Sequence, residues 1–203
     1  METTNNRKVI LASNNSHKIE EIKAILSSFQ YEVVSLKEAG IEVDVIEDGK
    51  TFEENAFKKA KEIMDLTGEI CLADDSGLEV YALDGAPGVY SARFSGQHGN
   101  YKKNNEKLIE MMENVQPEKR GARFVSSIVM LFPEGKDIRV EGYVEGIIGY
   151  EEIGENGFGY DPLFIIPKLD KTFAQLSSDE KNAISHRGNA LELLKVKLEE
   201  IGS

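Results

Sequence analysis

An α/β fold built on a mixed β-sheet is the fold class that this sequence predicts. Short β-rich apolar runs alternate with segments whose apolar residues recur at helical spacing, and two longer β-rich runs are separated only by the turn Pro133-Glu134-Gly135. The alternating part is typical of strands joined by helices, whereas the close pair is typical of an antiparallel hairpin. With 203 residues, the chain is expected to form a single compact domain, residues 1–203.

The N-terminal part of the chain predicts three strands and two helices. Strands are expected at 8–12, 31–36 and 70–73, and apolar residues at 19, 22, 25, 26 and 29 predict a helix after the first strand. Thr51 and Glu54 form a capping-box pattern that opens a second helix, which Gly68 ends. The third strand is expected to stop before an acidic turn at 74–77, because glycine at its end permits a tight turn.

The C-terminal part predicts a helix at 102–112, the hairpin strands 124–132 and 139–148, and one long final helix. Ser177 and Glu180 form a second capping-box pattern. Apolar residues from Ile184 to Ile201 suggest that this helix continues toward the C-terminus. On a continuous helix, Lys181 and Ser185 would share one face, and Asn182 and His186 would share the adjacent face.

Composition excludes several classes of function. The formal net charge of −12 opposes binding to nucleic acid, although a small polyanion can still bind where lysine and arginine gather. The single cysteine, Cys71, lies in an apolar run and is expected to be a buried core residue rather than a catalytic thiol. A polar N-terminus and the absence of any apolar run near ~18 residues predict no membrane association and a cytoplasmic protein.

The segment Ser13-Asn14-Asn15-Ser16-His17-Lys18 is a candidate phosphate-binding loop. It lies between a predicted strand and a predicted helix, where free backbone N–H groups and the helix dipole favour an anion. It lacks the spacing of a Walker A loop. By itself, such a segment is more often an ordinary polar turn with a helix cap.

Paired carboxylates in Asp74-Asp75-Ser76-Gly77 are candidate ligands for Mg²⁺. This ion prefers hard oxygen ligands and usually takes one or two carboxylates together with water and substrate phosphates. Asp75 with a second acid such as Glu47 would therefore be sufficient. The alternative is a turn without metal. Lys59, on a helix whose other lysines are expected to face solvent, could reach a phosphate.

Three further segments could recognise the rest of a nucleotide. Phe158-Gly159-Tyr160-Asp161-Pro162 offers rings on which a base could stack, unless both aromatics simply pack in the core. The segment from Glu180 to Gly188 contains His186 and Arg187, donors that could bind a keto oxygen or face solvent. The Gly/Pro-rich loop from Gly85 to Arg93 could close over phosphates or be an ordinary turn.

Taken together and in this order, the motifs resemble the Ham1 family of inosine/xanthosine triphosphate pyrophosphatases. The resemblance extends almost from end to end. It is carried by Ser13-x-Asn15-x-x-Lys18, Ala73 to Gly77, Gly85 to Arg93, Phe158 to Pro162 and Ser185-His186-Arg187.

The resemblance implies an elongated mixed sheet flanked by helices in two lobes, with the active site in the cleft between them, and a homodimer. It also implies that Asp75 is the catalytic residue and a metal site, and we place the second Mg²⁺ ligand at Glu47. Many relatives have two successive glutamates where this chain has Ile46-Glu47, so a one-residue shift leaves Asp48 as the alternative. The expected substrate-binding residues are Ser13, Asn14, Asn15, Ser16, His17, Lys18, Lys59, Ser76, Arg93, Phe158, Gly159, Tyr160, Asp161, Lys181, Ser185, His186 and Arg187.

The activity that the resemblance implies is hydrolysis of ITP, dITP and XTP to the nucleoside monophosphate and pyrophosphate. Asp75 would orient or deprotonate water, while Lys18 and the loop amides stabilise the leaving pyrophosphate. Two alternatives stay open: a pyrophosphatase for other modified nucleoside triphosphates, and a sensor that binds nucleotide without cleaving it. Neither the order of preference among the three substrates nor the basis for excluding GTP can be read from the sequence.

Overall fold

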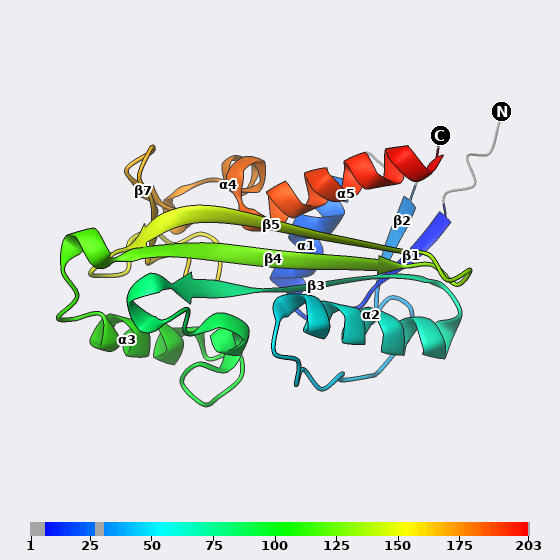
Figure 1. Ribbon diagram of the computed structural model, residues 1–203, viewed down its shortest axis with the longest axis horizontal. Coiled ribbons are helices and arrows are strands. Elements are labelled where there is room, and N and C mark those ends of the chain that lie inside the picture. The colour runs from blue at the N-terminus through cyan, green and yellow to red at the C-terminus, as the bar shows by residue number, and fades with distance from the viewer. Residues whose placement is uncertain (1–6, 27–30, 203) are drawn as a thin grey trace. The chain divides into compact units, whose positions relative to one another are not determined.

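The computed structural model describes residues 7–26 and 31–202, without side chains beyond residue 200, and it confirms the α/β class. Phe29 and the polar run at 1–6 lie outside the described residues, as does the side chain of Ile201. In the described part of the chain, seven strands form one mixed sheet in the order β2-β1-β3-β4-β5-β6-β7 (Figure 1). No helix in that part is long and apolar enough to cross a bilayer.

The chain divides into two compact units. Unit 1 comprises residues 1–75, 126–142 and 189–203, and unit 2 comprises residues 76–125 and 143–188. Strands β3, β4 and β5 and helix α5 each contribute residues to both units.

Unit 1 contains the parallel part of the sheet. Strand β1 (Arg7–Leu11) pairs in parallel with β2 (Tyr31–Ser35) and with β3 (Ile70–Val80), through registers such as Val9 with Val33 and Leu11 with Leu72. Helix α1 (Ser16–Leu26) connects β1 to β2, and α2 (Phe52–Thr67) precedes β3. Both connections are long enough for the crossover that joins two parallel strands.

The strands of unit 1 are buried on both faces because successive side chains point to opposite sides. Val9 and Leu11 pack with residues of α1 and α5 (His186–Gly202), whereas Ile10 packs with α2 (Figure 1). Helix α2 begins at the N-cap Thr51, whose hydroxyl accepts from the Glu54 N–H. Only half of the expected capping box forms there, since the Glu54 carboxylate accepts from the N–H of Lys50 instead.

Unit 2 has its own apolar core and the antiparallel edge of the sheet. Strand β5 (Asp137–Ile148) pairs antiparallel with β6 (Phe164–Ile166), which pairs antiparallel with β7 (Lys171–Thr172). Helix α3 (Tyr101–Met111) adds Leu108 to a core that includes Phe124, Phe164 and Phe173. Strand β4 (Gly121–Leu131) and β5 are neighbours joined by a five-residue loop, which is too short for a parallel connection. The predicted hairpin is therefore confirmed.

Two predictions about local structure were wrong. The acidic turn expected at 74–77 does not exist, because β3 runs without interruption from Ile70 to Val80. The single C-terminal helix is two helices, α4 (Ser178–Ile184) and α5, separated by Ser185 in an extended conformation. The Ser185 hydroxyl accepts from the N–H of Gly188, so this serine begins α5 and ends α4.

A close backbone approach explains why the chain turns at Ser185. A Cβ on Gly188 would lie 1.9 Å from the carbonyl oxygen of Asn182, so only glycine fits where the start of α5 meets α4. Because Ser185 and His186 do not continue α4, the helical faces predicted for Lys181 with Ser185 and for Asn182 with His186 are also wrong.

Candidate functional site

The strand-to-helix loop after β1 is a helix N-terminus held by its own side chains. Asn15 Oδ1 accepts from the Lys18 N–H at 3.2 Å and caps α1, while Ser13 Oγ accepts from the Asn15 N–H. Ser13 and Asn15 are partly buried, whereas Asn14, Ser16 and His17 are exposed. The expected loop between strand and helix is confirmed, and the dipole of α1 favours an anion there.

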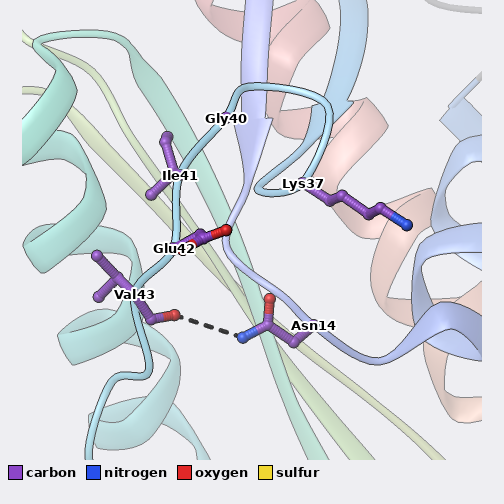
Figure 2. A pocket seen from close by; sticks show the side chains of 6 residues that line it. All are labelled: Asn14, Lys37, Gly40, Ile41, Glu42 and Val43. Atoms are coloured by element: carbon purple, nitrogen blue, oxygen red, sulfur yellow. Dashed lines mark hydrogen bonds between the residues drawn. The ribbon is translucent and has the colours of Figure 1, made fainter.

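A shallow pocket of about 230 Å³ lies beside this loop (Figure 2). The Asn14 amide donates to the carbonyl oxygen of Val43 at 3.4 Å, and the Lys37 side chain points away from that bond. The contact joins the loop after β1 to the segment that leads to Glu47. The pocket is lined by Asn14, Lys37, Gly40, Ile41, Glu42 and Val43.

The two carboxylates of β3 are buried and bind different lysines. Asp74 Oδ2 lies 2.8 Å from Lys18 Nζ, and Asp74 Oδ1 accepts from the Ser126 hydroxyl. Asp75 Oδ1 lies 3.5 Å from Lys59 Nζ, and Asp75 Oδ2 accepts from the Asn55 amide at 3.0 Å. These partners offset the cost of burying two charges, which is why the strand can continue through both residues.

Burial sets the electrostatics of this cluster. Loss of hydration raises the pKa of Asp75 above its ordinary value, despite the opposing effect of Lys59 and Lys18. Burial alone would lower the pKa of Lys59, but the carboxylates of Asp75 and Glu47 outweigh it, and the net pKa is raised. Lys59 is therefore held as a cation. Its ammonium also donates to the carbonyl oxygen of Asp74 at 2.9 Å.

Glu47 and Asp75 provide a donor set that suits a divalent cation. Both carboxylates approach one cationic group, since Glu47 Oε1 lies 2.9 Å from Lys59 Nζ. In contrast, the Asp48 side chain is 68% exposed and pairs with Lys58 on the surface. Among the described residues, no three His, Cys, Asp or Glu lie close enough to enclose a metal. The pair thus fits a cation that keeps water and phosphate ligands.

Unit 2 holds the second cluster, in which a buried ion pair contacts aromatic rings. Lys181 Nζ lies 2.7 Å from Asp161 Oδ2, and both side chains are at most 5% exposed. The ammonium is 4.8 Å from the centroid of the half-buried Phe158 ring. Asp161 Oδ2 also accepts from the Phe158 N–H at 2.8 Å, so one carboxylate fixes both the lysine and the loop.

His186 and Arg187 are both buried. The alternative interpretation of the sequence, in which the two side chains face solvent, is therefore wrong. The His186 ring stacks on Phe124 with centroids 4.8 Å apart, and Arg187 Nη2 donates to Ser76 Oγ at 2.9 Å. A buried guanidinium and a buried imidazole offer fixed donors to a ligand oxygen.

Tyr160 is a core residue and does not offer its ring as a stacking surface. It is 4% exposed, and its hydroxyl donates to the carbonyl oxygen of Ser91 at 2.9 Å. Ser91 Oγ donates to the Gly88 carbonyl and accepts from the Leu78 N–H, so Ser91 links the loop that contains Gly159 to β3.

Arg93 ends the Gly/Pro-rich loop that begins at Gly85. It is half-buried, and its guanidinium carbon lies 5.1 Å from the centroid of the Tyr90 ring. The loop therefore presents a cation that is held against one of its own aromatic side chains.

Comparison with known proteins assigns the family. The sequence profile described as Ham1 family matches residues 9–197. The chain belongs to the Ham1 family. A protein named dITP/XTP pyrophosphatase from Clostridium perfringens is 57% identical to this chain, covering 96% of it and 98% of the relative. One of the same name from Haemophilus influenzae is 48% identical, covering 95% and 99%.

Solved structures of Ham1 proteins have the same fold as this family member. The Staphylococcus aureus Ham1 protein matches with a TM-score of 0.86 and 45% identity, covering 96% of this chain and 99% of that one. The Coxiella burnetii HAM1 protein gives the same TM-score at 39% identity and covers 96% and 99%.

Several residues of this Ham1 chain that hold the site together were not predicted. Asn55 lies four residues before Lys59 on α2, a spacing that places two side chains on one helix face and could have revealed it. Ser126 was detectable as part of a serine pair inside the apolar run from Phe124 to Leu131. Asp74 was expected beside Asp75 but not as the partner of Lys18, because the sequence contains no sign of which carboxylate faces α1.

Proposed function

We propose that this Ham1 family member hydrolyses non-canonical purine nucleoside triphosphates, ITP, dITP and XTP, to the nucleoside monophosphate and pyrophosphate. The observation that carries the proposal is the cluster in unit 1 in which buried Asp75 and partly exposed Glu47 approach the ammonium of buried Lys59. Two carboxylates that approach one lysine can bind a divalent cation and accept a proton from water, functions that a protein that only bound nucleotide would not need. The names of the curated relatives support the same activity.

In this proposal, the residues of unit 1 act on the phosphates. Asp75 accepts a proton from water or orients it for attack on the α-phosphorus, and Lys18 and the amides at the start of α1 neutralise the departing pyrophosphate. Glu47 and Asp75 would hold Mg²⁺, which supplies Lewis-acid polarisation of the phosphoryl oxygens when it is bound. Asn14, Ser16 and His17 belong to the same proposed phosphate site.

The residues of unit 2 are proposed to recognise the purine. The half-buried Phe158 ring offers a stacking face, and His186 and Arg187 offer buried donors to a 6-keto oxygen. Tyr160 would support the loop from the core. Ser76, Arg93, Gly159, Asp161, Lys181 and Ser185 complete the proposed set.

The deciding experiment mixes the purified protein with ITP and Mg²⁺ and measures pyrophosphate and IMP. The proposal requires equal amounts of both products and a kcat that falls by ~10²–10⁴ in Asp75→Asn. Release of inorganic phosphate in place of pyrophosphate would contradict it, and so would tight ITP binding without any product. A panel of modified pyrimidine triphosphates tests the alternative of a different base specificity.

We also propose that both units belong to one enzymatic domain, residues 1–203, and that the protein acts as a homodimer in the cytoplasm. The family match spans both units, which supports the single domain. Burial raises the pKa of the Cys71 thiol to about 12, which fits the predicted core residue. Light scattering in solution tests the dimer.

A further inference from the structure

One buried amide joins the two parts of the carboxylate cluster in unit 1. The Asn55 side chain is fully buried on α2. Its Nδ2 donates to Asp75 Oδ2 at 3.0 Å, and its Oδ1 accepts from the Gly49 N–H at 2.8 Å. A single side chain therefore connects the carboxylate of β3 to the segment that contains Glu47.

The bond to Gly49 depends on a close approach that no other residue permits. A Cβ at position 49 would lie 2.6 Å from Asn55 Oδ1 and 2.9 Å from the Glu54 Cβ. The next residue, Lys50, donates its N–H to the Glu54 carboxylate at 2.7 Å. The segment is thus fixed to the first turn of α2 at two consecutive positions, starting two residues after Glu47.

The bond to Asp75 determines which carboxylate oxygen faces the cluster. Asn55 occupies Oδ2, whereas Oδ1 faces the Lys59 ammonium at 3.5 Å, the same ammonium that Glu47 contacts at 2.9 Å. A carboxylate without this bond could rotate about its Cβ–Cγ bond. With the bond, the plane of the Asp75 carboxylate is fixed. Hydrogen-bond partners commonly hold metal-ligating carboxylates in this way.

We propose that Asn55 is a positioning residue of this enzyme, which orients the Asp75 carboxylate and fixes the Glu47 segment so that both can bind one divalent cation. The inference rests on the proposed function of Glu47 and Asp75. Asn55 itself contacts neither substrate nor cation. It acts through the two bonds of its amide, and the substitutions Asn55→Asp and Gly49→Ala each disrupt a different one.

The first test measures metal binding without any turnover. Mn²⁺ alone is titrated into wild type, Asn55→Ala and Gly49→Ala, and bound ion is followed by electron paramagnetic resonance. Removing a residue that orients metal ligands typically weakens affinity by ~10–100-fold, so we expect a loss in that range for Asn55→Ala and a loss in the same direction for Gly49→Ala. Wild-type affinity in both variants would overturn the inference.

The second test separates kcat from KM with ITP and Mg²⁺. In Asn55→Asp, the acceptor for Gly49 remains, but the neutral amide donor is replaced by a second carboxyl, which repels Asp75 when it is ionised and shares a proton with Asp75 when it is not. We therefore expect kcat to fall by ~10–100-fold while KM for ITP changes little. The Asn55→Ala and Gly49→Ala losses should be less than additive in the double variant, because they act on one linkage. Unchanged kcat in Asn55→Asp, or full additivity, would overturn the inference.

Asn100→Ala is the matched control. Asn100 caps α3 in unit 2 by accepting from the Lys103 N–H, so its loss lowers Tm without touching the cluster. We expect this control to keep wild-type kcat and Mn²⁺ affinity at a reduced Tm. If it loses activity to the same extent as Asn55→Ala, the effect of Asn55 is only one of stability. If wild type itself does not cleave ITP, the proposed function fails, and the Mn²⁺ titration still decides the inference.

Discussion

Lys18 Nζ lies 2.8 Å from Asp74 Oδ2, an ion pair that links the first turn of α1 to the middle of β3. The Asp74 side chain is fully buried, while that of Lys18 is 13% exposed. The lysine proposed to bind phosphate is therefore held by the protein's own carboxylate on its inner side. The remaining donors of an ammonium group can still bind a ligand oxygen at the exposed edge.

Asp74→Asn should cost stability as well as substrate affinity. Removing one charge of a buried pair leaves the other unpaired, so we expect a loss on the order of 3 kcal/mol and a higher KM for ITP. Denaturant unfolding and steady-state kinetics measure the two effects. Asp65→Asn, which breaks the exposed pair with Lys61, is the control and should change neither. An Asp74→Asn variant as stable as this control would show that the pair contributes nothing.

Most strands and helices of unit 1 and the hairpin of β4 and β5 could be predicted because the spacing of apolar residues in these segments matches the faces that they bury in the fold. The wrong turn at 74–77 has a specific cause: two adjacent aspartates normally favour solvent, and contacts from α1, α2 and β4 allow them inside a strand. Those contacts are tertiary and leave no mark on the segment itself. The break at Ser185 was missed for a related reason, since the approach of Gly188 to Asn182 depends on packing rather than propensity.

The candidate site could be predicted as a set of residues but not as a set of contacts. The loop and strand-end motifs indicated Lys18 and Asp75, and the family resemblance implied Lys181, yet the partners Asn55 and Asp161 depend on which helix faces which strand. The preference for Glu47 over Asp48 likewise gains support only from tertiary contacts, since Glu47 contacts Lys59 beside Asp75 while Asp48 pairs with Lys58 on the surface.

The raised pKa of Asp75 predicts a pH-dependent stability in the absence of metal. A carboxyl whose pKa is higher in the folded state, mainly through burial, stabilises the fold below its unfolded pKa, ordinarily near 3.8, and loses that contribution as pH rises. The raised pKa of Lys59 contributes stability that is fully present below its ordinary value of 10.5 and is lost only above it, so Lys59 adds no pH dependence between pH 4 and pH 8.

Asp75→Asn should therefore have a higher Tm than wild type at pH 8 in EDTA. The difference should shrink as the pH falls toward 4. The comparison is thermal unfolding of both proteins from pH 4 to pH 8. A wild type that is more stable at pH 8 than the variant would show that the Lys59 and Lys18 contacts outweigh the burial of the Asp75 charge.

Base recognition should favour a 6-keto group over a 6-amino group. His186, Arg187 and Lys181 are buried donors. A site that binds one group of a substrate through buried donors can lower kcat/KM by a factor of ~10⁴ or more for a substrate that lacks this group. We expect this preference for ITP over ATP, and we expect Lys181→Met to reduce it. Comparable kcat/KM for the two nucleotides in wild type would refute the proposed base site.

The two aromatic residues of the loop before β6 should respond differently to substitution. Phe158→Ala removes a half-buried ring and should raise KM for ITP by a factor that corresponds to the loss of base stacking, about 1–3 kcal/mol. The loss of the contact between this ring and Lys181 should also lower stability. Tyr160→Phe removes only the bond to Ser91 and should cost about 1 kcal/mol of stability. Kinetics and denaturant unfolding of both variants test the contrast. Equal effects on KM would show that both rings contact the base.

Substitutions at Glu47 and Asp48 should show which of the two is the second metal ligand. Glu47 Oε1 shares the Lys59 ammonium with Asp75, whereas Asp48 is exposed and pairs with Lys58. Glu47→Gln removes one of only two carboxylates proposed to bind the cation and keeps its size. We therefore expect a higher Mg²⁺ concentration for half-maximal activity and a kcat lower by ~10–100-fold, the range seen when a metal site is disturbed.

Asp48→Asn is the matched control, because it removes a neighbouring charge in the same segment and breaks only a surface pair of small energetic value. Its Mg²⁺ activation curve should overlay that of wild type. The test is a titration of Mg²⁺ at saturating ITP with wild type, Glu47→Gln and Asp48→Asn. If Asp48→Asn shifts the curve and Glu47→Gln does not, the ligand is Asp48, and the segment must move by one residue when the cation and nucleotide bind.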